Sequence, residues 1–282
     1  MGTAKRERQK AGRQARLEQA KVAAAKKKRL RFVVYAVILV GVVTAALFLL
    51  APDDDDDVAT ATTSSSSSSS SSTPEGSPVT VAITVPPAGE TLTGETPCPA
   101  ADGSSPRTTT FAAAPPTCID PAKTYTAEVL TTEGIFSVDL DPVNAPVTVN
   151  NFVVLSRYHY YDGVAFHRII PGFMNQTGDA VGPTPGFGDA GYSIPDELPT
   201  GENPYPLGSL AMANSGPNTS GSQWFVTVED ASRLNSQPNY SRFGTVSSGM
   251  EVVLQINNYG TETQEGTPTQ EVLIESITIT ES

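Results

Sequence analysis

The chain has 282 residues, a formal net charge of −12, two cysteines and two histidines. So few cysteines exclude a disulfide-dense scaffold. The charge is unevenly placed, because residues 1–31 hold twelve Lys or Arg against two Glu, a net of +10, whereas residues 52–282 hold six Lys or Arg against twenty-eight Asp or Glu, a net of −22. The acidic part lacks the basic surface that nucleic-acid binding needs, so we expect no nucleic-acid partner.

Residues 32–51 carry no charged side chain, and twenty helical residues rise about 30 Å, the thickness of a bilayer's hydrocarbon core. Basic residues precede this stretch and Asp53–Asp57 follows it, so the positive-inside rule keeps residues 1–31 in the cytoplasm. We predict one transmembrane helix over 32–51 in contact with membrane lipid, in a single-pass protein of the cell membrane whose later residues lie outside the cytoplasm.

Two alternatives for this stretch stay open. A cleaved signal peptide would use Ala59-Thr-Ala61 as its cleavage site, but its apolar core usually spans only 7–15 residues. A buried core helix is the other alternative, which is disfavoured because this stretch is apolar on every face and is flanked by blocks of charged residues.

Residues 52–78 combine aspartates, a serine run and prolines, which predicts a disordered acidic and Ser-rich tether. Residues 79–122 are rich in Pro, Thr, Ala and Gly, and we expect an ordered but irregular lead-in there. Its cysteines, Cys98 and Cys118, predict a disulfide outside the cytoplasm. The bond would contribute about 3 kcal/mol in the chain-entropy model. The alternative is a pair of free thiols in a loose segment.

The pattern changes at residue 123, where apolar and polar residues begin to alternate as in β-strands. A hairpin is expected with its turn at Thr131–Gly134. Helices are expected over 147–157, after Pro146, and over 247–257, with Ser247 as N-cap. The remaining expected strands are 164–171, 173–177, 208–213, 223–228, 241–246 and 272–280. This pattern favours a closed antiparallel barrel over residues 123–282.

Two sequence segments carry the chemistry, Phe166–Asp179 and Leu210–Phe225. The first places one arginine, apolar side chains and a glutamine within nine residues, and neither segment contains a nucleophile–base pair, a metal-ligand cluster or a phosphate-binding loop. Together they indicate an apolar pocket edged by guanidinium and amide donors. Such a site binds a peptide and shifts its conformation without breaking a bond.

Both segments resemble the signature motifs of cyclophilin-type peptidyl-prolyl cis–trans isomerases, and the resemblance covers residues 123–282. It implies an eight-stranded antiparallel β-barrel capped by two helices, proline-containing polypeptide substrates, no cofactor and no metal. It assigns catalysis to Arg168. The substrate-binding residues that it implies are Phe173, Met174, Gln176, Ala213, Asn214, Gln223, Phe225, Leu234 and Tyr240.

Each of these residue types has a simpler role in isolation. An arginine such as Arg168 usually forms a surface salt bridge, aromatic and Met residues on strands usually belong to the core, and a glutamine is usually solvated. His167 lacks a carboxylate or serine partner in its motif and is interpreted as structural.

Three residues depart from the family pattern. Thr177 stands where glycine is usual and is expected to crowd the backbone, and Trp224 replaces phenylalanine. Arg233 stands near a usual tryptophan, which puts inhibitor sensitivity in doubt.

The sequence therefore predicts a membrane-anchored, monomeric peptidyl-prolyl isomerase that assists the folding of extracytoplasmic proteins. A proline-peptide binding module without turnover is the competing hypothesis, since the same pocket serves both. A scaffold domain that only docks partners is a third.

Overall fold

The structure, a computed structural model, describes residues 83–282 except 183–185, 235–238 and 264. The predicted tail 1–31, transmembrane segment 32–51 and tether 52–78 lie outside the described residues. Among the helices that are described, none has the length and apolar character needed to cross a bilayer.

A nine-stranded sheet organises the domain, with its strands in the order β5-β11-β3-β4-β10-β8-β9-β7-β6. Neighbouring strands in it are antiparallel. The strands are β3 (Tyr125–Thr131), β4 (Gly134–Leu140), β5 (Val164–Ala165), β6 (Arg168–Ile170), β7 (Met174–Thr177), β8 (Ser209–Met212), β9 (Trp224–Thr227), β10 (Arg242–Ser248) and β11 (Leu273–Glu281). Most predicted strands agree within two residues at each end, and the β3–β4 turn falls at the expected Thr131–Gly134.

The prediction of a closed eight-stranded barrel is wrong, because the sheet has nine strands and keeps two edges, β5 and β6. These edges are consecutive in the chain, separated only by Phe166 and His167, so the sheet must curl to bring them together. The expected single strand 164–171 breaks there, because Phe166 is fully buried in the core and its N–H donates to Val272 on the β11 side. The hydroxyl of Thr177 donates to the carbonyl of Ala165 at 2.9 Å and links β7 to β5 across the gap.

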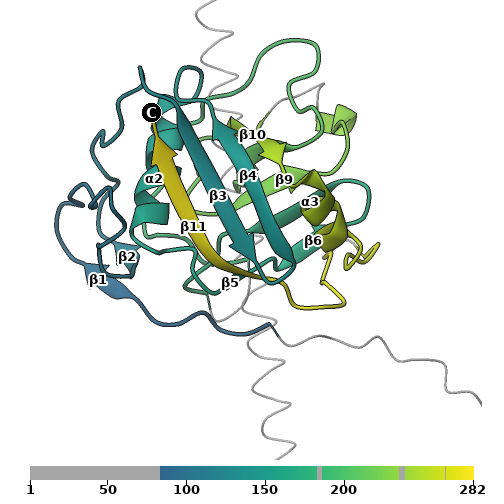
Figure 1. Cartoon of the computed structure of the whole chain (residues 1–282), viewed down its shortest axis with the longest axis horizontal. Coiled ribbons are helices and arrows are strands. Elements are labelled where there is room, and N and C mark those ends of the chain that lie inside the picture. The colour runs from purple at the N-terminus through teal and green to yellow at the C-terminus, as the bar shows by residue number, and fades with distance from the viewer. Residues whose placement is uncertain (1–82, 183–185, 235–238, 264) are drawn as a thin grey trace, which may run out of the picture. The chain divides into compact units, whose positions relative to one another are not determined.

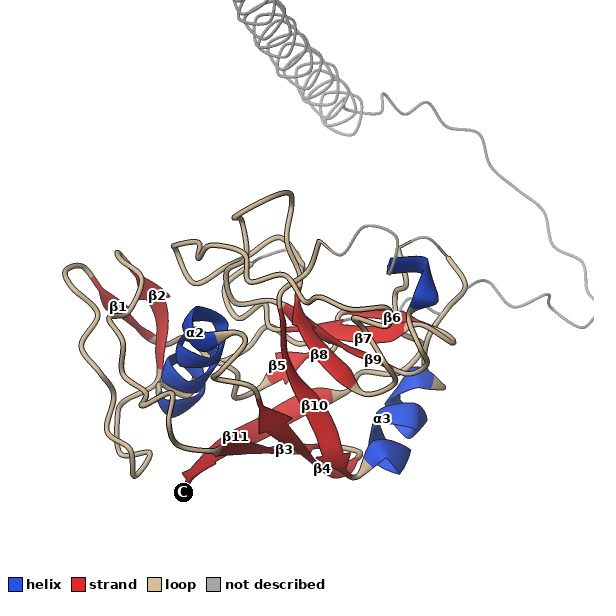
Figure 2. Ribbon diagram, turned by 90° about the horizontal axis from the view of Figure 1, so that it is seen from above, coloured by secondary structure: helices blue, strands red, loops and turns tan. Residues whose placement is uncertain are grey.

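Two helices flank the curled sheet (Figure 2). The helix α2 (Pro146–Arg157) packs against β10 and β11, and α3 (Met250–Asn257) packs against β4, β6 and β7. A short 3₁₀ turn, η1 (Ser232–Leu234), follows β9.

Helix α2 forms although its two adjacent asparagines are poor helix formers. Both are buried and find tertiary partners. Asn150 accepts from the backbone N–H of Cys118 at 2.6 Å and donates to the Pro116 carbonyl at 2.9 Å. Asn151 donates to the Gly221 carbonyl at 2.8 Å. Hydrogen bonds to distant segments thus outweigh the local propensity, and the helix prediction is confirmed.

Helix α3 begins three residues later than expected, so the prediction of Ser247 as N-cap is wrong. Strand β10 runs through Ser248, and Gly249 turns the chain with a φ of 74°. A side chain there is excluded, since a Cβ atom would lie 2.5 Å from the carbonyl oxygen of Ile135. The turn requires glycine, which fixes where the helix starts.

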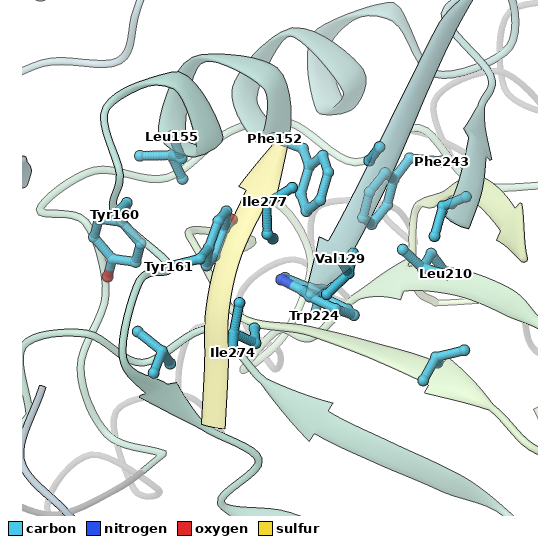
Figure 3. Packing of buried hydrophobic residues seen from close by; sticks show 14 of the residues in the cluster. Val129, Phe152, Leu155, Tyr160, Tyr161, Leu210, Trp224, Phe243, Ile274 and Ile277 are labelled. Atoms are coloured by element: carbon cyan, nitrogen blue, oxygen red, sulfur yellow. The ribbon is translucent and has the colours of Figure 1, made fainter. Parts of the chain in front are cut away.

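The core is built around Trp224, which is fully buried. Its ring makes edge contacts with Phe152, Tyr161 and Phe166 at centroid distances of 5.9, 6.3 and 6.1 Å. Figure 3 shows this cluster below α2, with Phe243 beside Phe152. The tryptophan that departs from the family pattern therefore fills the centre of the core, which is consistent with a tolerated aromatic exchange.

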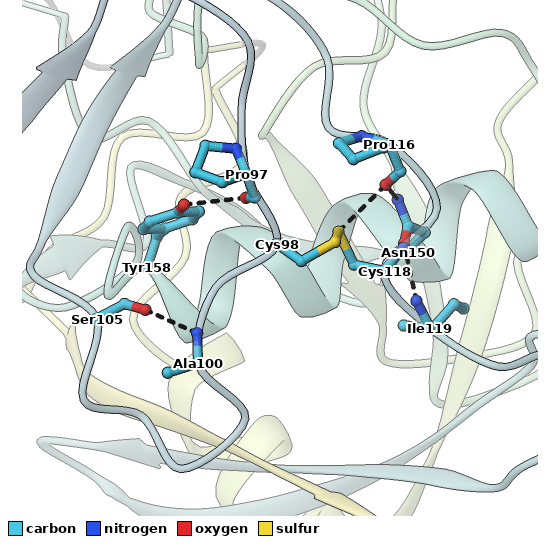
Figure 4. The surroundings of a disulfide bond; sticks show 9 residues. All are labelled: Pro97, Cys98, Ala100, Ser105, Pro116, Cys118, Ile119, Asn150 and Tyr158. Atoms are coloured by element: carbon cyan, nitrogen blue, oxygen red, sulfur yellow. Dashed lines mark hydrogen bonds between the residues drawn. A yellow bond between two sulfur atoms is a disulfide. The ribbon is translucent and has the colours of Figure 1, made fainter.

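The lead-in is ordered as expected, but it is more regular than expected. It contains a parallel pair, β1 (Glu90–Leu92) and β2 (Thr108–Phe111), which lies beside α2 (Figure 1). The disulfide between Cys98 and Cys118 is present, with a Cα–Cα distance of 5.4 Å, which confirms the predicted pair (Figure 4). Phe111 is buried in the main core, so the lead-in is part of the folded domain.

One prediction concerns the start of α2, whose N-cap residue, Ala145, offers no side-chain acceptor. The Glu197 carboxylate, fifty residues away, accepts from the N–H groups of Val147 and Thr148 at 3.0 and 2.8 Å and from the Thr148 hydroxyl at 2.7 Å. We expect Glu197→Ala to lower the free energy of unfolding by about 1–2 kcal/mol, the usual effect of losing a cap. Urea unfolding checks this, with the exposed Glu275→Ala as control; equal midpoints for the two variants would contradict it.

Candidate active site

The strand register places the predicted polar and apolar site residues on one face. Arg168 pairs with Gln176, Gln176 pairs with Phe225, and Phe225 pairs with Ala211, so one row crosses β6, β7, β9 and β8. Paired residues on neighbouring strands point to the same side of a sheet. Met174, two residues before Gln176, shares this face.

The alternate residues point the other way and build the core. Ile169, Asn175 and Trp224 are fully buried. Thr177 also belongs to this face, where its hydroxyl is satisfied by the Ala165 carbonyl. Thr177, which was expected to crowd the backbone beside Gln176, thus has its side chain on the core face, because period-two alternation turns it away from the site.

A cavity of about 260 Å³ lies on the site face. Its floor is apolar and its rim carries one guanidinium and two amides. It is lined by Arg168, Phe173, Met174, Gln176, Ala213, Asn214, Phe225 and Tyr240. Eight of the ten residues implied by the resemblance thus meet around one cavity.

The two remaining residues lie next to it. Leu234 packs against the apolar cluster that contains Met174 and Phe225. Gln223 lines a second cavity, also of about 260 Å³, which shares Gln176, Ala213 and Asn214 with the first. The further lining residues of the second cavity are Gly186, Phe187, Gly188, Asp189, Ser215, Thr219, Gly221 and Ser222. The two cavities form a continuous recess with Gln176, Ala213 and Asn214 at their border.

A chain of side-chain amides fixes the guanidinium of Arg168. The Nη1 atom of Arg168 donates to Oε1 of Gln176 at 3.2 Å, and Nε2 of Gln176 donates to Oε1 of Gln223 at 3.0 Å. Gln223 in turn donates to the carbonyls of Gly186 and Gly188 at 3.0 and 2.8 Å. Because those carbonyls only accept, they set the orientation of both amides and present an oxygen to Arg168.

The charge of Arg168 is not neutralised by an acidic partner among the residues that the structure describes, since the ion pairs found there involve other residues. The salt bridge weighed as its simpler role is therefore not formed. Partial burial lowers the pKa of Arg168 from its usual value, an effect opposed by nearby Tyr240. The group remains a cation, because arginine has so high an intrinsic pKa.

A tyrosine that the sequence analysis did not single out supports the apolar wall of the first cavity. The buried Tyr205 donates its hydroxyl to the carbonyl of Tyr240 at 2.7 Å and accepts from the Tyr240 N–H at 3.0 Å. Tyr240 then stands edge-on to Phe225, with ring centroids 5.4 Å apart. Only the pairing of distant segments brings Tyr205 there, and no local motif marks it.

The guanidinium of Arg233 lies over the ring of Phe173, which lines the first cavity. Its guanidinium carbon lies 4.2 Å from the ring centroid of Phe173, and its Nη2 pairs with Glu229 at 3.2 Å. The residue at the position where the family often has tryptophan thus contacts the same wall of the cavity through a cation–π interaction.

No hydrogen-bonded nucleophile–base pair is found among the described residues that line the two cavities. Among the described residues, no group of three or more His, Cys, Asp or Glu side chains is placed to hold a metal ion. The arrangement can hold a ring-shaped apolar group, fix peptide backbone through amides, and direct a cation at it.

The family model for cyclophilin type peptidyl-prolyl cis-trans isomerases matches residues 126–279. The chain belongs to this family. Its domain is a peptidyl-prolyl cis–trans isomerase of the cyclophilin type, and the fold agrees with that family's curled sheet and two helices.

Several relatives are similar to this cyclophilin domain. Peptidyl-prolyl cis-trans isomerase-like 1 of Aspergillus fumigatus is 41% identical over 145 residues, which cover 51% of this chain and 88% of that protein. The mouse peptidylprolyl isomerase domain and WD repeat-containing protein 1 is 42% identical over 158 residues, 54% of this chain but only 24% of that protein. The chain thus spans about a quarter of the latter's length.

Solved structures give the same result. A cyclophilin type peptidyl-prolyl cis-trans isomerase from Cryptosporidium parvum superposes with a TM-score of 0.51 at 30% identity, over 56% of this chain and 99% of that one. A second structure of that protein, in the presence of the dipeptide Ala-Pro, gives a TM-score of 0.50.

One prediction concerns His167, which directly precedes Arg168 and strand β6. It is buried next to Asp179, and this burial lowers its pKa from 6.5 to about 4 despite the nearby carboxylate. Between pH 6.5 and 4, the imidazole of His167 is therefore protonated in the unfolded chain but neutral in the folded chain. The free energy of unfolding should fall by about 3 kcal/mol as pH falls through this window.

Urea unfolding at several pH values measures this loss. In His167→Gln the slope of stability against pH should flatten between pH 6.5 and 4. An unaltered slope in His167→Gln would show that other groups cause the acid sensitivity.

Proposed function

We propose that this cyclophilin domain accelerates rotation about X-Pro bonds through Arg168, and that it does so outside the cytoplasm on exported polypeptides. The observation that carries the catalytic part is a guanidinium that has no acidic partner among the described residues and is oriented by a neutral amide at the mouth of an apolar cavity.

The reaction requires no bond cleavage. Resonance gives the X-Pro amide a rotation barrier of about 18–20 kcal/mol, and the uncatalysed step takes tens to hundreds of seconds. At the transition state the amide is twisted, resonance is lost and the proline nitrogen regains a lone pair. A donor aimed at this nitrogen stabilises the twisted form more than either planar form, which is what lowers a barrier.

The side chains divide this work. Phe173, Met174 and Phe225 supply an apolar surface for the pyrrolidine ring, and the amides of Gln176 and Asn214 face the backbone around the rotating bond. Arg168 supplies the donor. Its charge is permanent, and its planar fork is positioned by Gln176 before substrate arrives.

A peptide longer than a dipeptide would fill both cavities. With its proline in the first cavity, the chain passes Gln176, Ala213 and Asn214 and enters the second. The Ala-Pro dipeptide present with the related C. parvum cyclophilin is the minimal ligand for the first cavity.

The extracytoplasmic location is supported by two features. Residues 32–51 have the length and composition of a membrane span with a basic flank on its N-terminal side. The Cys98–Cys118 disulfide favours an oxidising compartment. A single-pass anchor with the cyclophilin domain outside accounts for both, and newly exported polypeptides are then the available substrates.

The catalytic proposal predicts that Arg168→Ala lowers kcat/KM on an X-Pro peptide by about 100- to 1000-fold, the usual effect of removing one preorganised donor. Arg168→Lys should recover little of this loss, since an ammonium lacks the fork. The assay is exchange NMR or protease-coupled isomerisation. The control is Arg242→Ala, an arginine of β10 that lines a separate cavity.

Turnover within twofold of the unsubstituted chain in Arg168→Ala would refute the catalytic role. Peptide binding without any acceleration by the unsubstituted chain would instead favour the binding-module hypothesis.

The location proposal predicts that the full chain stays in the membrane fraction after alkaline carbonate washing. Protease added to intact cells should remove the cyclophilin domain and leave residues 1–31 protected. Deletion of 32–51 should release the chain from the membrane fraction. A domain protected from external protease would place it on the cytoplasmic side and contradict the proposal.

A further inference from the structure

The lead-in residues 83–122 lie entirely outside the segment matched by the family model, yet they contact residues that follow the wall of the second cavity in the chain. The wall of that cavity is formed in part by residues 186–189. The chain then continues through Ala190, Gly191 and Tyr192, and these three residues contact β2 of the lead-in. We call residues 186–192 the wall segment.

Phe111, at the end of β2, supports the wall segment directly. Its N–H donates to the carbonyl of Ala190 at 2.9 Å, and its ring packs edge-on against Tyr192 at 6.1 Å. The contact is close, because a Cβ atom at Gly191 would lie 2.4 Å from the Phe111 carbonyl oxygen. The wall segment therefore has little freedom to move toward the lead-in.

The wall segment is also connected by hydrogen bonds to Gly221, which lines the second cavity. Tyr192 donates its hydroxyl to Asn151 at 2.6 Å, and Asn151 donates to the carbonyl of Gly221, which lines the cavity. A Cβ atom at Gly221 would meet Asp189 at 3.1 Å and the Tyr192 carbonyl at 3.3 Å. A shift of Tyr192 would thus displace residues on two sides of the second cavity.

The disulfide holds the lead-in in this place. The residue before Cys98 accepts through its carbonyl from the Tyr158 hydroxyl at 3.0 Å, and the N–H of Cys118 donates to Asn150 at 2.6 Å. Both ends of the bridged loop are thereby attached to α2 (Figure 4). Tyr158 also packs edge-on against Phe111 at 5.5 Å, so α2, the disulfide loop and Phe111 form one packed unit.

We propose that the disulfide-closed lead-in, through Phe111, is a positioning element for the second cavity, and that it sets the affinity for substrate residues that flank the proline. This rests on the proposed isomerase function. Among the described residues, no hydrogen bond or ring contact joins the lead-in to the side chains that line the first cavity, so it acts on binding of the extended peptide and leaves the rotation step at Arg168 unchanged.

The test compares two substrates on the full 282-residue chain in mild detergent. One is the dipeptide Ala-Pro, which reaches only the first cavity. The other is a hexapeptide with Ala-Pro at its centre, which extends on both sides of the bond. Exchange NMR at several substrate concentrations gives kcat and KM for each. The variant is Cys98→Ser with Cys118→Ser, and the control is Ser105→Ala, which removes a hydrogen bond to Ala100 inside the same loop without touching the wall segment.

We expect the double variant to raise KM for the hexapeptide by about three- to tenfold with kcat within twofold, and to leave kcat/KM for Ala-Pro unchanged. The control should match the unsubstituted chain on both substrates. Equal losses on both substrates, or no loss on either, would overturn the positioning role. Failure of the unsubstituted chain on both substrates would instead refute the isomerase function itself.

A second variant covers the case in which the double variant does not fold, as judged by circular dichroism. Phe111→Leu keeps an apolar side chain and the backbone hydrogen bond to Ala190 but loses the ring contact with Tyr192. It should show the same selective rise of KM for the hexapeptide, and an unchanged KM would overturn the proposal.

Discussion

The hydrogen bond from Arg168 to Gln176 is the interaction on which the site depends. A long arginine side chain has many rotamers, and ordering it costs free energy that some partner must offset. A carboxylate would hold it more strongly, but it would also neutralise the charge on which the proposed catalytic role depends. A neutral amide fixes the direction of the guanidinium and leaves its positive charge available to a weak acceptor such as a twisted amide nitrogen.

The amide can do this only because the sheet fixes its orientation. Gln176 lies opposite Arg168 on a neighbouring strand, and Gln223 and two loop carbonyls determine which end of each amide points where. The opposite face of the same strands is packed around Trp224 in a close aromatic cluster. A rigid core on one face therefore gives the site on the other face its precision, and the loops contribute mainly the rim.

The folded unit is larger than the segment shared with the relatives. Family similarity begins at residue 126, yet Phe111 is buried in the main core and the Cys98–Cys118 loop is attached to α2. Asn150 and Asn151, which weaken α2 as an isolated helix, serve this attachment: one binds the lead-in and the other binds the cavity floor. Unfavourable local propensity is here explained by tertiary contacts.

The sequence by itself indicated the candidate site residues, through the resemblance of its two motifs to a known family. The composition of the same motifs indicated an apolar pocket edged by guanidinium and amide donors. The sequence also paired the only two cysteines. These features depend on near neighbours or on residue type alone.

Only the tertiary structure decided which residues that lie far apart in the sequence contact each other. Nothing near Glu197 shows that it caps a helix fifty residues away, and nothing near Tyr205 shows that it holds Tyr240. The start of α3 after Gly249 likewise follows from the close contact of this residue with Ile135. The open sheet edges at β5 and β6 follow from the break in the strand at Phe166. Local patterns fix the direction of a side chain, whereas its partner is chosen by strand pairing and packing over the whole domain.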